Sequence, residues 1–390
     1  MKILYAAIDQ SIPGTQGGSV HVQAVADGLA ARGHDVHVLA SPGDRPFPSS
    51  AVTWHALGPP FGLRQLRVAR SGHAIDLARR FRPDVVIERY YNFGGEGLRA
   101  AKAVDALAVL EVNAPIVDYP GSPKRLIDRA LLIEPMRRWR NWQCRIADLI
   151  VTPSAAILPP FVDAARIVRL EWGADVARFH PAVTGPLPFQ PRPGRMIAVF
   201  AGTFRPWHGA IHLASAIRTL RERNRHDIDA VFIGTGDEAL RVRAAAHGLD
   251  GVTFTGAIPH DRMPAALAAA DVGVAPFDTG AHPPLLLDFY WSPLKIFEYM
   301  AAGLPVVAPA IDRLHQIVRP DREGVLYDPA RGDGLASALE SLTDRSRRER
   351  LGTAARRRVI AEFSWATHCV RLEEAMTAAL ERRRAARANS

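Results

Sequence analysis

Short strand-like segments alternate with amphipathic helical segments along most of this 390-residue chain. Residues 2–6 form an apolar strand-like run, 19–32 show helical periodicity that ends at Gly33, and 35–40 are strand-like again. Such alternation predicts a parallel sheet with right-handed crossovers. Because it starts anew at residue 196, we expect an α/β protein. Its two Rossmann-like, doubly wound parallel-sheet domains should face a cleft, and a long helix should end the chain.

The expected domain boundaries follow from length and proline content. A chain of 390 residues is too long for a single core of ordinary size. Five prolines lie within residues 181–195, which is typical of an interdomain linker. We therefore expect an N-terminal domain at 1–180, a linker at 181–195, a C-terminal domain at 196–362, and a C-terminal helix with a tail at 363–390.

Composition argues against several classes of protein. No apolar run approaches the roughly 18 residues that span a bilayer, and the N-terminus lacks a signal-peptide core. The two cysteines, Cys144 and Cys369, are isolated, which fits a reducing cytoplasm and offers no disulfide framework. The net charge of +9 favours anionic partners. No zinc-finger, RNA-recognition or helix-turn-helix motif occurs, so we expect no nucleic-acid partner.

One segment of the second half has the residues of an anion site. Ser292 suits a helix N-cap, Pro293 the first helical position and Gly303 the helix end. The helix follows a strand, so its amino end should point at the cleft. The free backbone amides of Leu294 and Lys295 can then bind an anion with the help of the helix dipole.

The side chains of this helix allow two interpretations. Lys295 adds a full positive charge at the helix start, which suits a phosphate. Glu298 lies three residues further on and can accept two hydrogen bonds from a ribose diol. The spacing alone fits equally well an ordinary capped helix in which Lys295 and Glu298 form a surface ion pair.

The run Ser-Pro-Leu-Lys-Ile-Phe-Glu-Tyr-Met-Ala-Ala-Gly-Leu-Pro-Val-Val-Ala at 292–308 resembles the donor-binding signature of glycosyltransferase family 4. It is most similar to the subgroup with Ser-Pro-Leu-Lys at this point. The resemblance implies the GT-B fold and a nucleoside diphosphate sugar as donor. It places the helix start at Ser292, Leu294 and Lys295 against the distal phosphate and Glu298 against the ribose. The family often has a second Glu where this chain has Tyr290.

A glycine turn at Gly202 extends the resemblance to the first strand of the second domain. The family commonly has Arg directly after this glycine and Lys further on, where this chain has Thr203 and His208. Arg205 is the nearest strong cation, and it can clamp a diphosphate or be an exposed turn residue. His208 can be a donor ligand or a turn residue.

Two further turns belong to the same resemblance. Gly234 and Gly236 follow the second strand of this domain, and the resemblance places them at the nucleotide. Ile258 follows the third strand, where the family's backbone groups meet the base. Each turn could equally serve packing alone.

The N-terminal half offers candidates for the other wall of the cleft. Gly17 and Gly18 precede the first helix, where the resemblance places donor phosphates and acceptor. They are not part of a Gly-x-Gly-x-x-Gly motif, so a nicotinamide dinucleotide is not expected. Glu88 and Arg89 end a predicted strand and are acceptor-side candidates. His21 is another, although it also suits a satisfied helix histidine.

Asn113 stands where many relatives have a residue that contacts the transferred sugar. Its amide can donate and accept hydrogen bonds but cannot shuttle a proton at pH 7. Family 4 enzymes retain anomeric configuration, with the leaving diphosphate accepting the acceptor's proton. The resemblance therefore implies a retaining transferase whose catalytic group is Arg205, Lys295, Glu298 and Asn113.

The resemblance also bears on cofactors and acceptors. The chain has no Asp-x-Asp motif suited to a metal-bridged diphosphate, so we expect neither a required metal nor a cofactor. The acceptor should be a hydroxyl of a glycan, a lipid-linked intermediate or a small metabolite. Two alternatives remain: a nucleotide-sugar epimerase on the same fold, and a non-catalytic protein that binds sugar nucleotides.

A basic stretch at 124–145 includes Leu131, Trp139 and Trp142 among its arginines. Such an amphipathic segment can lie on acidic lipid, or it can pack its apolar stripe on its own domain. We expect a cytoplasmic protein, with peripheral contact at the inner face of the cell membrane as an option.

Overall fold

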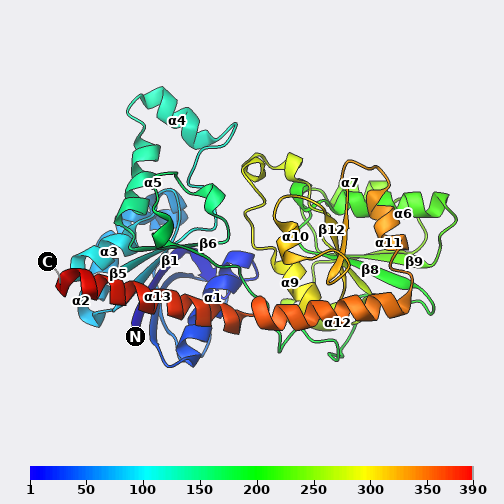
Figure 1. The fold of residues 1–390 in the computed structure, drawn as a ribbon, viewed down its shortest axis with the longest axis horizontal. Helices are drawn as coiled ribbons and strands as arrows, with labels where there is room; N and C mark the ends of the chain where they lie inside the picture. The colour runs from blue at the N-terminus through cyan, green and yellow to red at the C-terminus, as the bar shows by residue number, and fades with distance from the viewer. Residues whose placement is uncertain (389–390) are drawn as a thin grey trace. The chain divides into compact units, whose positions relative to one another are not determined.

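The structure, a computed structural model, describes residues 1–388, which form two compact units (Figure 1). Unit 1 contains Met1–Trp172, the short segment Tyr290–Ser292 and the described residues from Trp365 onward. Unit 2 contains Gly173–Phe289 and Pro293–Ser364. Among the described residues, no helix combines the length and hydropathy needed to cross a bilayer.

Unit 1 is built on a parallel sheet of seven strands in the order β3-β2-β1-β4-β5-β6-β7. Its strands are β1 (Lys2–Ile12), β2 (Asp35–Pro42), β3 (Thr53–Ala56), β4 (Val85–Arg89), β5 (Leu107–Glu111), β6 (Leu149–Thr152) and β7 (Ile167–Arg169). Its helices are α1 (Gly17–Ala31), α2 (Ser71–Phe81), α3 (Glu96–Val104), α4 (Pro123–Leu131), α5 (Pro135–Ile146) and α13 (Trp365–Ala388). The strand order reverses between β1 and β4, which is where ligands bind in such sheets.

The C-terminal helix α13 belongs to the core of unit 1. Cys369, Leu372 and Met376 of α13 are buried with the apolar residues of β1, β2 and α1. A Cβ added to Gly28 of α1 would lie 2.5 Å from the Cys369 sulfur, so the glycine permits this close approach. The last helix of the chain therefore completes the first unit.

Unit 2 has a parallel sheet of six strands in the order β10-β9-β8-β11-β12-β13, the Rossmann order. Its strands are β8 (Met196–Ala201), β9 (Ile228–Ile233), β10 (Val252–Gly256), β11 (Val272–Val274), β12 (Val306–Pro309) and β13 (Gly324–Tyr327). Its helices are α6 (Ala210–Glu222), α7 (Ala239–Ala245), α8 (Met263–Ala268), α9 (Leu294–Ala301), α10 (Leu314–Ile317), α11 (Gly334–Glu340) and α12 (Arg345–Glu362). Its switch point lies between β8 and β11.

The two parallel sheets and the long last helix confirm the predicted fold class. The units divide between Trp172 and Gly173, so the proline-rich stretch 181–195, expected as the linker, lies inside unit 2. The basic stretch is two helices rather than one. Leu132 and Glu134 both take positive φ, and this left-handed backbone separates α4 from α5.

Candidate donor site

Three glycine turns lie side by side at the carboxyl ends of β8, β9 and β10. The Gly202 amide donates to the Ile233 carbonyl and the Gly234 amide to the Gly256 carbonyl, each at 2.9 Å. Gly234 has a φ of +133°, and a Cβ there would lie 2.0 Å from the Gly202 oxygen. Only glycine fits such a contact. Gly236 is equally restricted, because a Cβ on it would lie 2.6 Å from the Phe204 oxygen.

The helix α9 is anchored to this edge of the sheet by Tyr299. Its hydroxyl accepts a hydrogen bond from the Ala201 amide at 2.8 Å, and a Cβ on Gly273 of β11 would collide with its ring. Ala201 ends β8, so Tyr299 holds α9 beside the Gly202 turn. Sequence reasoning missed this residue, because a tyrosine within an apolar helix carries no distinctive signal.

The predicted cap of α9 is wrong. Pro293 occupies the N-cap position and no side chain caps the helix. Ser292 belongs to unit 1, where its hydroxyl donates to the Glu171 carboxylate at 2.6 Å and accepts from the Trp172 amide at 3.0 Å. The first helical amide with an intrahelical partner is that of Ile296. The amides of Leu294 and Lys295 therefore precede the helical hydrogen-bond ladder, as an anion site requires.

Lys295 does not form the surface ion pair with Glu298 that the sequence spacing allowed. Its Nζ is buried, and no atom of residues 1–388 makes a hydrogen bond to it. It lies 4.3 Å from the centroid of the Phe200 ring and 5.3 Å from that of Phe277. Burial lowers the pKa of Lys295 to about 7, although the charge of Glu298 opposes the shift. An orphaned buried amine is rare, and this one adjoins the Gly202 turn, where a Cβ would lie 3.3 Å from it.

His208 and Arg205 flank the same turn. The Nδ1 of His208 lies 2.6 Å from the Thr203 carbonyl oxygen, so this nitrogen carries the proton and donates. Burial, followed by the charge of Lys295, lowers the pKa of His208 to about 3. The ring is therefore neutral at pH 7 and does not act as a cation toward phosphate. Arg205 is exposed, with its guanidinium 5.3 Å from the Trp207 ring centroid.

Glu298 lies one turn after Lys295 on α9. Its side chain is 13% exposed, and one carboxylate oxygen lies 3.7 Å from the His260 Nε2. Among the described residues, Glu298 forms no ion pair with Lys295, and the Lys295 Nζ has no hydrogen-bond partner. Ile258 lies two residues after Gly256, in the loop that leads to His260. The carboxylate predicted for the ribose and the turn predicted for the base therefore lie near each other.

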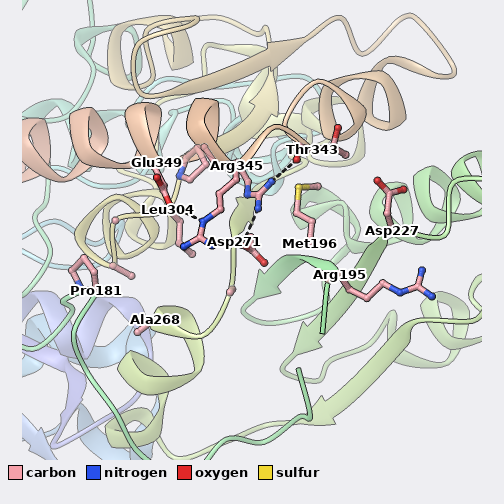
Figure 2. Close-up of a pocket in the computed structure, with 16 residues that line it drawn as sticks. Pro181, Arg195, Met196, Asp227, Ala268, Asp271, Leu304, Thr343, Arg345 and Glu349 are labelled. Atoms are coloured by element: carbon pink, nitrogen blue, oxygen red, sulfur yellow. Dashed lines mark hydrogen bonds and ion pairs between the residues drawn. The ribbon is translucent and has the colours of Figure 1, made fainter. Parts of the chain in front are cut away.

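A separate cavity of about 570 Å³ lies at the amino ends of strands of the unit 2 sheet, opposite the glycine turns (Figure 2). Met196, Asp271 and Pro305, which stand at the amino ends of β8, β11 and β12, help to line it. Its arginines are mostly paired: Arg348 contacts Asp271 at 3.4 Å and Arg345 contacts Glu349 at 2.8 Å. Carboxyl ends of strands hold ligands in this fold, so volume alone does not mark the site.

In unit 1, Asn113 is fixed at both ends of its amide. Its Nδ2 donates to the Glu111 carboxylate, and its Oδ1 accepts from the Trp172 indole at 2.9 Å. Glu111 also accepts from the Tyr5 hydroxyl and the Arg89 guanidinium. Glu111 and Trp172 were not among the predicted residues, because Tyr5 lies 106 residues from Glu111 and Asn113 lies 59 residues from Trp172.

The three acceptor-side candidates are buried. His21 stacks on Trp172 with 4.5 Å between ring centroids, and its Nδ1 lies 3.2 Å from Arg89. Burial, and then the charge of Arg89, holds the pKa of His21 well below its usual range. Glu88 accepts from Arg67 at 2.9 Å and from the amides of Gly95 and Gly97. Its carboxylate is thus occupied inside the unit, which favours a structural role.

Gly17 and Gly18 open α1, which begins two residues earlier than expected. A Cβ on Gly18 would lie 2.2 Å from the Gln10 side-chain oxygen, and one on Gly17 would touch the Trp172 ring at 3.4 Å. The pair thus allows close packing at the carboxyl end of β1. Tyr290, which replaces the family's usual carboxylate, is buried in unit 1, and burial raises its pKa to about 12.

The two parallel α/β sheets and the long last helix make up the GT-B fold. Sucrose-phosphate synthase from Thermosynechococcus elongatus superposes with a TM-score of 0.71 at 19% identity, covering 96% of this chain and 97% of that one. The model for Glycosyltransferase Family 4 matches residues 15–167, and that for Glycosyl transferases group 1 matches 195–345. The chain belongs to glycosyltransferase family 4, as its donor-helix motif suggested.

Curated relatives include mycobacterial mannosyltransferases. A GDP-mannose-dependent alpha-(1-6)-phosphatidylinositol monomannoside mannosyltransferase of Mycobacterium tuberculosis is 32% identical over 225 residues, 55% of this chain. The match spans 56% of that relative, a little over half its length. A GDP-mannose-dependent alpha-mannosyltransferase of Mycolicibacterium smegmatis is 28% identical over 98% of this chain and 99% of its own.

Proposed function

We propose that this chain is a retaining glycosyltransferase that moves a sugar from a nucleoside diphosphate sugar to a hydroxyl acceptor. The observation that carries the proposal is the Nζ of Lys295 at the start of α9, which is buried and has no hydrogen-bond partner among residues 1–388. A diphosphate there would receive the ammonium and the amides of Leu294 and Lys295. GDP-mannose is the first donor to test, because it is named for both mycobacterial relatives.

The chain's own residues would supply positioning and charge. Lys295 and the helix start hold the diphosphate, and the exposed Arg205 guanidinium would stabilise the charge that develops as the glycosidic bond breaks. Glu298 accepts from the ribose hydroxyls, while Ile258 and Gly256 border the base. The leaving phosphate oxygen takes the acceptor's proton, so no general base is needed. The Asn113 Nδ2 already donates to Glu111 and its Oδ1 already accepts from Trp172. A contact with the transferred sugar would therefore use the remaining N–H or lone pair of this amide.

No metal or cofactor enters this proposal. Among residues 1–388, no group of three or more His, Cys, Asp or Glu side chains is placed to hold a metal ion. That the reaction needs no metal stays a prediction, for which activity after chelation is the measurement.

Product analysis tests the proposal directly. The protein is incubated with a panel of nucleotide sugars, with and without hydroxyl acceptors, and the products are analysed by mass spectrometry and anomeric NMR. We expect a glycosylated acceptor with the donor's anomeric configuration. An isomeric nucleotide sugar formed from donor alone would establish the epimerase instead, and nucleotide binding without any turnover would establish a non-catalytic binder.

A lipid-linked acceptor is the substrate class that unit 1 favours. In Figure 1, α4 stands away from the sheet of its unit. The α4 tip, defined as residues 126–133, exposes Leu126, Leu131, Leu132 and Ile133 by 61, 55, 87 and 60%. The tip also contains the exposed Arg129, and the exposed Arg125 and Arg138 lie before and after it in the chain. Apolar side chains among arginines suit the headgroup region of an acidic bilayer.

The tryptophans expected at this surface lie elsewhere. The Trp139 indole donates to the Gly94 carbonyl at 2.9 Å, and the Arg99 guanidinium lies over both Trp139 and Trp142. These rings pack on unit 1, so the α4 tip alone would enter the lipid. We propose a cytoplasmic protein whose α4 tip makes peripheral contact with the inner face of the cell membrane.

Vesicle sedimentation tests this contact. We expect binding to vesicles that contain phosphatidylglycerol, weaker binding to pure phosphatidylcholine, and loss of binding in Leu132→Asp. Leu240→Asp is the matched control, because Leu240 is 83% exposed on α7 of unit 2. Equal binding of Leu132→Asp and the unaltered protein would contradict the contact.

A further inference from the structure

Three of the four passages of the chain between its units start or end at one cluster of unit 1. The chain leaves unit 1 after Trp172, returns at Tyr290, leaves again after Ser292 and returns at Trp365. Within unit 1, Trp172, Ser292 and Trp365 are joined by contacts of their side chains. The Ser292 hydroxyl is bonded to Glu171 and Trp172, and the rings of Trp172 and Trp365 lie 6.5 Å apart. His368 completes the cluster, with its Nδ1 2.7 Å from the Glu171 carbonyl oxygen.

Ser292 is held in both of its hydrogen-bonding roles. Its hydroxyl donates to the Glu171 carboxylate at 2.6 Å and accepts from the Trp172 amide at 3.0 Å. The charged acceptor makes the first of these a strong hydrogen bond. Pro293 follows directly, with its φ restricted by the ring, and the helix α9 begins at the next residue. Fixing Ser292 therefore restricts the peptide that leads to the amides of Leu294 and Lys295.

Trp172 connects the same cluster to Asn113. Its backbone amide binds Ser292, while its indole Nε1 donates to the Asn113 Oδ1 at 2.9 Å. The indole is packed against His21 at 4.5 Å and below the Arg89 guanidinium at 5.7 Å. One rigid side chain thus joins the segment before the donor helix to the residue expected at the transferred sugar.

We propose that Glu171 is a positioning residue for the donor: through Ser292 it sets the conformation of the peptide that begins α9. Trp172, whose backbone amide donates to Ser292, also fixes the Asn113 side chain through its indole. The inference rests on the proposed donor site, and it adds residues that the family's donor motif does not contain. Glu171 does not touch the donor; it acts through the serine.

Two loss variants and two conservative ones test the role. Ser292→Ala removes the hydroxyl and Glu171→Met removes the acceptor, whereas Ser292→Thr and Glu171→Gln retain them. We expect each loss variant to weaken calorimetric binding of the nucleoside diphosphate about tenfold and to raise the donor KM more than it lowers kcat. Ser292→Thr and Glu171→Gln should recover most of the affinity. The double loss variant should be no weaker than either single one, because both remove the same contact.

Ser215→Ala is the matched control, because the Ser215 hydroxyl donates to the Ile211 carbonyl of its own helix α6. Thermal midpoints close to that of the unaltered protein show that each variant folds. Affinity and KM within twofold of the unaltered protein in both loss variants would overturn the positioning role and leave the proposed function standing. If the unaltered protein binds no nucleoside diphosphate, the proposed function itself fails.

Discussion

The Nζ of Lys295 lies 4.3 Å from the centroid of the Phe200 ring, and the described residues offer it no hydrogen-bond acceptor. The face of an aromatic ring attracts a cation but does not replace its hydration shell. The ammonium therefore costs free energy to bury, and burial lowers its pKa to about 7. A diphosphate beside Gly202 would supply both the acceptors and the opposite charge.

The affinity for a nucleoside diphosphate should fall as the pH rises above 7. In the unfolded chain a lysine holds its proton up to a pKa of about 10.4, whereas in the folded chain Lys295 releases it near 7. Because the unfolded state then binds more protons, this group makes the free energy of unfolding rise between about pH 7 and pH 10. Bound diphosphate favours the charged lysine and so takes up a proton in the same window.

Calorimetry at pH 7.5 and 9.5, in buffers of different ionisation enthalpy, measures both effects. We expect a loss of affinity of roughly ten- to a hundredfold across this interval, with proton uptake on binding. Lys295→Arg keeps its charge at both values and should show no such dependence. A flat profile for the unaltered protein, without proton uptake, would contradict a lysine ligand of low pKa.

Glu298 should distinguish a ribonucleotide from its 2′-deoxy analogue. Its carboxylate is 13% exposed and lies 3.7 Å from the His260 Nε2, so at least one oxygen can accept from a diol. Glu298→Gln loses the charge but keeps its size, and it should weaken ribonucleoside diphosphate binding by about tenfold. The 2′-deoxy analogue should be affected much less. Equal losses for both nucleotides would remove the ribose role.

The stability of unit 1 should depend on Arg67. Its guanidinium is fully buried and contacts Asp9, Glu88 and Glu96. Burial, followed by the charge of Glu96, raises the pKa of Glu88 to about 8. Arg67→Met leaves the carboxyls without their cation and should lower the free energy of unfolding by about 3–5 kcal/mol at pH 8.

Urea unfolding at pH 5.5 and pH 8 measures this loss. The deficit should shrink at pH 5.5. At that pH the buried carboxyls of the folded variant can be protonated and neutral, whereas at pH 8 they are closer to being buried as unpaired charges. Arg79→Met, which breaks an exposed pair with Asp76, is the control and should change little. A deficit below 1 kcal/mol at pH 8 would show that the cluster does not stabilise the unit.

The sequence predicts the sheets well and their edges poorly. The central strands are largely apolar runs: β8 begins at residue 196 as expected, while the strand expected at 2–6 is the first part of β1, which continues to Ile12. The edge strand β3 is half exposed and pairs only with β2, and β7 has three residues. Neither carries a periodic pattern. The packing of α13 on unit 1 depends on Gly28 and Cys369, residues whose contact no local pattern reveals.

In the donor site, too, the sequence predicts the helix but not the contacts of its side chains. The motif around Lys295 marks the helix, but only the fold brings Phe200 and Phe277 around the ammonium and buries it. The spacing before α9 suggests a serine cap, yet the hydroxyl of Ser292 is bonded to Glu171, 121 residues away in sequence. Local rules therefore find the element, and long-range contacts decide what each side chain does.

The most direct test of the donor assignment is the affinity of the protein for GDP and UDP with Lys295 replaced. Lys295→Met removes the ammonium and should weaken binding by one to two orders of magnitude, roughly 1.5–3 kcal/mol at pH 7.5. Its thermal stability should not fall, because no hydrogen bond within the described residues is lost. Lys102→Met, on the exposed face of α3, should bind like the unaltered protein. Calorimetric affinity that is the same in Lys295→Met and Lys102→Met would contradict the phosphate role of α9.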